Sequence, residues 1–98
     1  MQLRAIGGLT LRRAVFGMFF EAGRPLSVPE VVAALAASGV KVGEHLAKPE
    51  HMVIADMLAY QVRAGRLRRV RRGIYDVVPG ALSRSTRWRC RHWRDRLY

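Results

Sequence analysis

The sequence predicts an α+β fold of one domain, in which helices alternate with short strands and a basic tail follows. Three observations carry this prediction. Residues 51–64 place apolar side chains at helical spacing, as an amphipathic helix does. Two β-favouring runs, 67–70 and 74–78, follow directly and are separated by a loop that contains glycine. Half of the residues are apolar, as in a folded domain, and a chain of 98 residues is too short for a second core.

Positive charge is concentrated in the C-terminal third of the chain. The net charge is +11, of which residues 61–98 hold +10 and residues 1–60 only +1. Sixteen of the 18 basic residues are arginine, whose guanidinium fork suits bidentate contacts with phosphate and guanine. This charge predicts a polyanionic partner, although charge alone does not distinguish DNA from other polyanions.

The first predicted helix covers about residues 10–22 and follows a loose N-terminal arm of residues 1–9. Thr10 can cap this helix, and Gly23, with Pro25 close behind, can end it. The helix has the fullest apolar stripe of the chain and is therefore expected to be core: Leu11, Ala14, Val15, Met18, Phe19 and Ala22.

A second helix is predicted from a capping-box pattern, Ser27-Val28-Pro29-Glu30. In this pattern the serine and glutamate side chains each accept a hydrogen bond from a backbone N–H of the other residue. The helix should run to about Ser38 and end at Gly39.

Residues 40–42, Val-Lys-Val, are expected to form a short strand, and residues 44–48 an irregular segment. About ten residues separate the second helix from the helix 51–64, whereas a tight helix-turn-helix uses only a few. A strand in this place can join the later hairpin. We therefore expect a three-stranded sheet and the order helix, helix, strand, helix, strand, strand.

The helix 51–64 is the candidate DNA-reading element. Pro49 suits its first turn, and Gly65 suits the left-handed position just after its last turn. Its inward stripe holds Ile54, Ala55, Leu58 and Val62. Its outward face mixes charged, aromatic and small residues and can lie in a major groove: Met52, Asp56, Ala59, Tyr60 and Arg63. Tyr60 can either contact the groove or cap the edge of the core.

The next segment predicts a hairpin whose loop is Arg71-Arg72-Gly73, with glycine available for a positive φ. Arginines on such a narrow tip can contact phosphates or enter a narrow minor groove. The candidate nucleic-acid-binding residues of this segment are Arg66, Arg68, Arg69, Arg71, Arg72 and Gly73. The alternative is a solvated face that discourages edge-to-edge pairing of strands.

Pro79-Gly80 ends the domain 10–79, and residues 80–98 form a C-terminal extension rich in arginine and tryptophan. As a helix, this tail aligns five residues on one stripe: Leu82, Thr86, Cys90, Trp93 and Leu97. As a strand, it alternates arginines with four other residues: Thr86, Trp88, Cys90 and His92. We expect the helix, packed on the domain or on a second subunit.

The tail adds five candidate phosphate contacts: Arg84, Arg87, Arg89, Arg91 and Arg94. Its two tryptophans, Trp88 and Trp93, could stack on bases, which is typical of single strands or RNA. They could equally anchor the tail to the core, which is the interpretation we favour.

The chain offers no constellation for catalysis, a metal or a cofactor. Its seven carboxylates are scattered, and Cys90 beside His92 cannot complete a metal site. The single cysteine excludes an intramolecular disulfide, and it is either a small apolar contact or a thiol activated by neighbouring arginines. No run is apolar enough for a signal peptide or a membrane span. We therefore expect a cytoplasmic, nucleoid-associated protein without catalysis or membrane contact.

Two segments together resemble the winged helix-turn-helix superfamily. They are Arg24-Pro25-Leu26-Ser27-Val28-Pro29-Glu30-Val31-Val32 and, after the helix 51–64, Gly65-Arg66-Leu67-Arg68-Arg69-Val70-Arg71-Arg72-Gly73-Ile74-Tyr75. Within the superfamily the chain is most similar to HARE-type domains and to the N-terminal winged helix of type IV toxin–antitoxin antitoxins, where a phrase like R-V-x-R-G-x-Y forms the wing. The resemblance covers about residues 10–79.

The resemblance implies DNA binding without catalysis, with Tyr60 and Arg63 on the recognition helix and Arg71, Arg72 and Gly73 on the wing. The chain is expected to depart from the antitoxins, because we expect no C-terminal effector domain. It departs from acidic polymerase-associated relatives because its charge has the opposite sign.

The function expected from these observations is that of a small basic protein that binds double-stranded DNA, as a transcriptional regulator or nucleoid-type factor. The helix 51–64 would read the major groove, and the wing 71–73 would contact the backbone or minor groove. A homodimer fits this function. The alternative is an interaction adaptor that docks on the transcription machinery or on another acidic protein partner.

Overall fold

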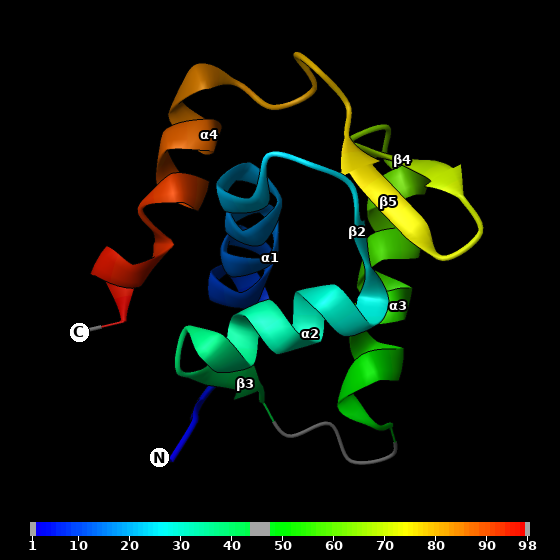
Figure 1. Cartoon of the computed structure of the whole chain (residues 1–98). Coiled ribbons are helices and arrows are strands. Elements are labelled where there is room, and N and C mark those ends of the chain that lie inside the picture. The colour runs from blue at the N-terminus through cyan, green and yellow to red at the C-terminus, as the bar shows by residue number, and fades with distance from the viewer. Residues whose placement is uncertain (1, 44–47, 98) are drawn as a thin grey trace.

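The computed structural model describes residues 2–43 and 48–97, and within them it holds four α-helices, one 3-10 helix and five strands in two small sheets (Figure 1). The helices are α1 (Gly8–Ala22), α2 (Val28–Ala37), α3 (Glu50–Arg63), α4 (Arg84–Arg91) and the 3-10 helix η1 (Trp93–Arg96). The strands are β1 (Arg4–Ile6), β2 (Leu26–Ser27), β3 (Val40–Val42), β4 (Leu67–Arg71) and β5 (Ile74–Val77). The fold class is therefore α+β, as expected. Residues 44–47, most of the segment predicted to be irregular, lie outside the described residues.

Helix α1 begins two residues earlier than predicted. Gly7, in an extended conformation, is its N-cap, and the N–H of Leu11 donates to the Gly7 carbonyl at 3.2 Å. The prediction that Thr10 caps the helix is therefore wrong, because Thr10 already lies inside the first turn. The predicted end is confirmed: Gly23 is left-handed at φ 63°, and its N–H donates to the carbonyl of Phe19 at 3.0 Å.

The capping box of α2 is confirmed. The Ser27 hydroxyl accepts from the N–H of Glu30 at 3.2 Å, and the Ser27 N–H donates to Oε1 of Glu30 at 2.9 Å. The helix ends at Ala37, and the N–H of Ser38 returns to the carbonyl of Ala34 at 3.1 Å. Local hydrogen bonding thus determines both ends of this helix.

The strand Val40–Val42 forms, but the prediction that it joins the hairpin is wrong. β3 pairs in parallel with β1, so part of the arm predicted to be loose is a strand whose Ile6 is buried. The third strand of the hairpin sheet is instead β2, whose Leu26 pairs with Tyr75. The ten residues of α2 advance the chain by about 15 Å, so its two flanking strands cannot both reach the hairpin. The observed order is therefore helix, strand, helix, strand, helix, strand, strand from α1 to β5.

The hairpin β4–β5 is antiparallel and has a shorter loop than predicted. Arg71 pairs with Ile74, and Arg69 with Tyr75, which leaves Val70 as an extra residue in a bulge. The turn therefore consists of Arg72 and Gly73 alone, and Gly73 adopts a φ of 75° that glycine tolerates. The prediction that Arg71 lies in the loop is wrong, because the bulge allows the strand to continue through it.

The core is one hydrophobic cluster centred on α1. The predicted inward residues of α1 are buried, except for the exposed Ala22: Leu11, Ala14, Val15, Met18 and Phe19. Figure 1 shows α1 between the tail on one side and α3 with the hairpin on the other. Helix α2 crosses the lower end of α1. The central helix therefore separates two halves that both carry arginines.

The tail is helical over Arg84–Arg91 and Trp93–Arg96, which excludes the alternative strand. Its predicted stripe is buried at Leu82, Cys90, Trp93 and Leu97 and half-buried at Thr86. This stripe packs on α1 and belongs to the same hydrophobic cluster as the rest of the core. None of the described helices is long and apolar enough to cross a membrane.

Candidate nucleic-acid interface

Helix α3 is anchored by a narrow buried stripe that leaves its predicted outward face in solvent. Ile54 and Leu58 are completely buried, whereas Ala55 and Val62 of the predicted stripe are only half-buried. Pro49 lies one position outside the helix as its N-cap. The chain then leaves through Ala64 and the left-handed Gly65 and enters β4, so the helix and the hairpin are directly joined.

A buried glutamine ties this junction together, and the sequence did not reveal it. Gln61 is 3% exposed, and its Oε1 accepts from Nη1 of Arg66 at 2.9 Å. The backbone N–H of Arg66 also donates to the Gln61 carbonyl at 2.9 Å, and the Arg66 carbonyl accepts from the N–H of Val78. Arg66, a predicted nucleic-acid contact, therefore has part of its guanidinium committed to holding α3 against the base of the hairpin.

The outward face of α3 is exposed where the sequence predicted it, except at Ala59, which is half-buried. Met52, Asp56, Tyr60 and Arg63 all lie in solvent. Tyr60 is 56% exposed and therefore does not cap the core, and the Arg63 guanidinium lies 6.0 Å from its ring centroid. Asp56 is paired with Nζ of Lys48 at 2.5 Å. This pairing compensates the negative charge of Asp56, which would otherwise repel phosphate from this face.

The arginines of the hairpin differ in how far they are engaged. Arg68 lies 3.8 Å from the carboxylate of Asp76, and the Arg69 guanidinium lies 5.8 Å from the ring centroid of Tyr75. Arg71 and Arg72 are exposed, and within the described part of the chain neither pairs with a carboxylate. The free positive charge of the hairpin is therefore at its tip, beside Gly73.

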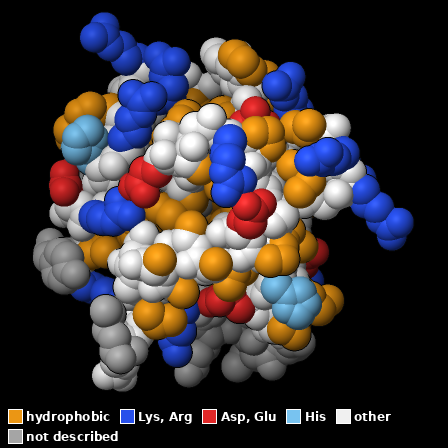
Figure 2. Space-filling view, viewed as in Figure 1, with side chains coloured by type: hydrophobic (Ala, Val, Ile, Leu, Met, Phe, Trp, Pro, Cys, Tyr) orange, Lys and Arg blue, Asp and Glu red, His pale blue; other side chains and the backbone are white. Residues whose placement is uncertain are grey.

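The predicted tail arginines do not join this face. Figure 1 shows α4 and the α3–hairpin half on opposite sides of α1. Arg84 and Arg89 are exposed, Arg87 is half-buried, and the Arg91 guanidinium lies 5.2 Å from the ring centroid of Phe20. Figure 2 shows Lys and Arg side chains gathered over the upper part of the visible surface, from the α4 side to the hairpin side.

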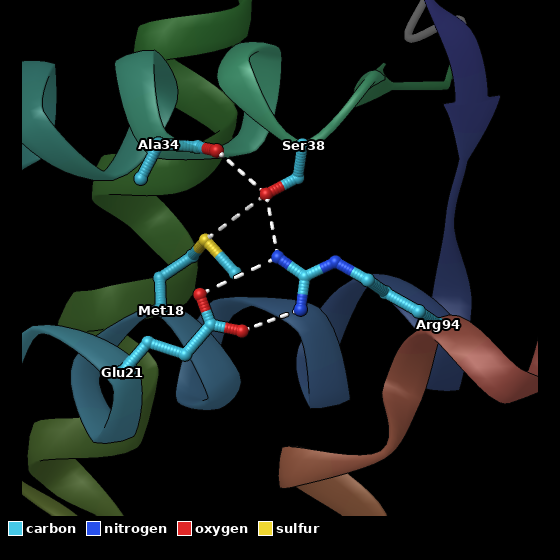
Figure 3. A network of polar contacts seen from close by, with 5 residues as sticks. All are labelled: Met18, Glu21, Ala34, Ser38 and Arg94. Atoms are coloured by element: carbon cyan, nitrogen blue, oxygen red, sulfur yellow. Dashed lines mark hydrogen bonds and ion pairs between the residues drawn. The ribbon is translucent and has the colours of Figure 1, made fainter.

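Arg94 is engaged in a partly exposed network of polar contacts (Figure 3). Its guanidinium pairs with Glu21, donates to the Ser38 hydroxyl at 2.8 Å and lies 4.7 Å from the ring centroid of Trp93. The Ser38 hydroxyl in turn donates to the carbonyl of Ala34 at 3.0 Å. Arg94 thus links the end of the tail to α1 and α2, and a role for it in nucleic-acid binding stays a prediction.

The two tryptophans of the tail have different environments. Trp93 is completely buried against α1, which confirms that it anchors the tail. Trp88 is 54% exposed and stacks on His92, with ring centroids 4.2 Å apart, so the interpretation that it too anchors the tail to the core is wrong. Burial raises the pKa of the Cys90 thiol, while the nearby charges of Arg13 and Arg12 lower it less. Because Cys90 is also buried, it is an apolar contact of the tail rather than an activated thiol.

Two arginines that the sequence analysis did not single out lie on α1, between the tail and the half formed by α3 and the hairpin. Arg12 and Arg13, on α1, line a cavity of about 270 Å³ together with Arg66 and Arg89. The adjacent pair was visible in the sequence, but α1 was interpreted only through its apolar stripe. The packing of the tail against α1 adds Arg89 to the other three arginines.

Among the side chains that the structure describes, no group of three or more His, Cys, Asp or Glu residues could hold a metal ion. Comparison of this chain with family models, with curated proteins and with solved structures finds no match.

Proposed function

We propose that this chain is a small DNA-binding protein of the winged-helix type, with α3 in the major groove and the β4–β5 hairpin as the wing. The observation that carries the proposal is the continuity of the exposed face of α3 with an arginine-tipped hairpin. Arg63 lies on that face, and Arg71 and Arg72 lie at the tip. The buried Gln61–Arg66 pair holds these two elements together.

The arrangement of the elements supports the winged-helix resemblance. Three helices pack together, and a hairpin that follows the third helix is extended by a short third strand. This third strand, β2, comes from before α2 rather than after it, but the hairpin remains next to α3. The narrower similarity to HARE-type domains and to type IV antitoxins stays a prediction.

Electrostatics favour a polyanion on this face. Each carboxylate on the segment 50–77 is engaged: Glu50 accepts from the N–H of Val42 at 2.7 Å, Asp56 pairs with Lys48, and Asp76 lies 3.8 Å from Arg68. The positive charges of Arg63, Arg71 and Arg72 therefore have no competing acid beside them among the described residues. Such a surface attracts phosphate at long range and can then make bidentate contacts.

The test is fluorescence anisotropy of the full chain with duplex DNA, single-stranded DNA and duplex RNA at several salt concentrations. If about five phosphates are neutralised, log K should fall with log salt at a slope of about −4.5, or several hundred-fold between about 50 and 200 mM. A slope shallower than about −2, or a preference for single strands or RNA, would count against the proposal.

The matched variants are Arg72→Gln and Lys41→Gln, which each remove one positive charge. Lys41 is exposed on β3, which Figure 1 shows far from the hairpin. Arg72→Gln should weaken binding to all duplexes and flatten the slope by about 0.9, whereas Lys41→Gln should change neither. Equal effects of the two variants would mean that only net charge matters.

Sequence reading is tested on α3. Arg63→Ala should weaken a selected site by about 1–3 kcal/mol more than random duplex DNA, because a base contact discriminates between sequences. An equal loss on both sequences would make Arg63 a phosphate contact.

A second candidate function, an adaptor that docks on a transcription protein, is favoured by exposed apolar side chains on the same surface. Met52 is 45%, Tyr60 is 56% and Val70 is 48% exposed. Apolar and aromatic side chains in solvent suit a protein interface. A stoichiometric protein partner that survives nuclease treatment, and is lost in Met52→Asp, would support the adaptor over the DNA reader.

A further inference from the structure

The cavity between α1 and α4 brings together four arginines and no acid. Arg12 and Arg13 come from α1, Arg89 from α4, and Arg66 from the start of the hairpin. No Asp or Glu is among the described residues that line it. Four positive charges around one small cavity repel one another, and this repulsion raises the free energy of the folded protein. A bound anion reduces the repulsion.

The guanidinium groups of this cavity are available to a ligand. Across the described part of the chain, Arg12, Arg13 and Arg89 have no ion pair with a carboxylate. Arg66 is oriented by its hydrogen bond to Gln61, which leaves its other donors unassigned. Arg12 and Arg89 are exposed, whereas Arg13 and Arg66 are half-buried, so two charges lie at the surface and two lie deeper.

The lining chemistry indicates which anion would fit. Arginine presents a planar fork that matches the oxygens of a phosphate group. Phe16, Leu82 and Cys90 are buried and add apolar surface to the same cavity. A volume of about 270 Å³ accommodates a small ligand. These features together suit a phosphate group attached to a compact apolar or aromatic body.

We propose that this cavity is a phosphate-ester binding site, distinct from the face formed by α3 and the hairpin tip. The phosphate would be held by Arg13 and Arg66, with Arg12 and Arg89 closing over it, and the attached group would lie against Phe16 and Leu82. The site does not rest on the proposed reading by α3 and the wing, because none of its four arginines lies on α3 or in the turn of the hairpin. The phosphate can belong to a free organic phosphate or to a nucleic-acid backbone.

The first arm of the test is titration calorimetry of the full chain with pyrophosphate and with adenosine monophosphate, at constant ionic strength and without DNA. Saturable binding at one site per chain is expected. Arg13→Gln and Arg89→Gln should each weaken it by about tenfold, the effect of losing one charge-assisted hydrogen bond. Lys41→Gln, which removes the same charge far from the cavity, should leave the affinity within about twofold, as expected for a screened remote charge.

The second arm repeats these variants with duplex DNA. If neither small phosphate binds, but Arg13→Gln and Arg89→Gln weaken duplex binding by about tenfold and Lys41→Gln does not, the phosphate belongs to the nucleic-acid backbone. If both arms show no greater effect of the cavity variants than of Lys41→Gln, the proposal is wrong. Unfolding midpoints without ligand verify that each variant is folded, and Arg12→Gln replaces any variant that is not.

Discussion

Gly17, in the middle of α1, lies directly against the indole ring of Trp93, at the other end of the chain. A Cβ at position 17 would lie 2.6 Å from the carbonyl oxygen of Cys90 and 2.7 Å from Cδ1 of Trp93. Real side chains do not approach so closely, so the tail can pack at this depth only because residue 17 has no side chain.

Gly17→Ala should therefore destabilise the protein. The clash involves a backbone carbonyl, which cannot rotate away, and overpacking typically costs about 1–3 kcal/mol. Alanine gains about 1 kcal/mol in helix propensity, so the unfolding free energy measured in urea should fall by up to about 2 kcal/mol. Ala33→Gly at an exposed position of α2 measures the propensity contribution separately. A stabilised Gly17→Ala variant would show that the tail does not lie this close in solution.

The two tryptophans should differ sharply in their contribution to stability. Trp93→Ala removes a completely buried ring and should lower the unfolding free energy by about 3–5 kcal/mol. Trp88→Ala removes only an exposed ring stacked on His92, and should change it by less than about 1 kcal/mol. Trp88→Phe leaves Trp93 as the single tryptophan, whose emission should be blue-shifted as expected for a buried indole. A red-shifted emission would mean that the tail is detached.

Glu30 should make stability depend on pH in the acid range. A hydrogen bond from the Ser27 backbone N–H, and then the contact with Arg24, lower the pKa of Glu30 from 4.5 to about 2. Since the folded pKa is the lower one, this stabilisation is complete above 4.5 and is lost as pH falls towards 2.

The measurement is the urea midpoint of the wild type and of Glu30→Gln, from neutral pH down to about 2, the folded pKa. Glutamine can keep the capping hydrogen bond but does not titrate. The difference in urea midpoint between the wild type and Glu30→Gln should therefore shrink as the pH falls through the acid range. A difference that stays constant would show that ionisation of Glu30 does not contribute.

The Arg94–Glu21 pair should contribute only weakly to stability. The two side chains are 41% and 47% exposed, so solvent screens their attraction. A double-mutant cycle with Arg94→Gln and Glu21→Gln should give a coupling of about 0.2–1 kcal/mol, and less at high salt.

If Arg94 holds the tail in place rather than binding phosphate, Arg94→Gln should lower DNA affinity less than Arg91→Gln does. An equal loss of affinity would make Arg94 a phosphate contact as well.

The features that the sequence determined are those that depend on residues close together along the chain. The capping box of Ser27 and Glu30, the ends at Gly23 and Gly65 and the inward stripes each depend on a few neighbouring residues. Their hydrogen bonds and rotational preferences are the same in almost any fold. The outward face of α3 could be predicted for the same reason, since its residues follow from the buried ones at helical spacing.

Only the tertiary structure decided which distant segments meet. β3 and β2 are both short strands, and the position of α2 determined that β2 pairs with the hairpin and β3 with β1. The tail could have packed on several surfaces, but Gly17 admits Trp93 on α1. That contact moved the tail arginines away from α3 and gathered Arg12, Arg13, Arg66 and Arg89 around one cavity. Such pairings depend on shape and reach across the whole molecule, which local spacing does not encode.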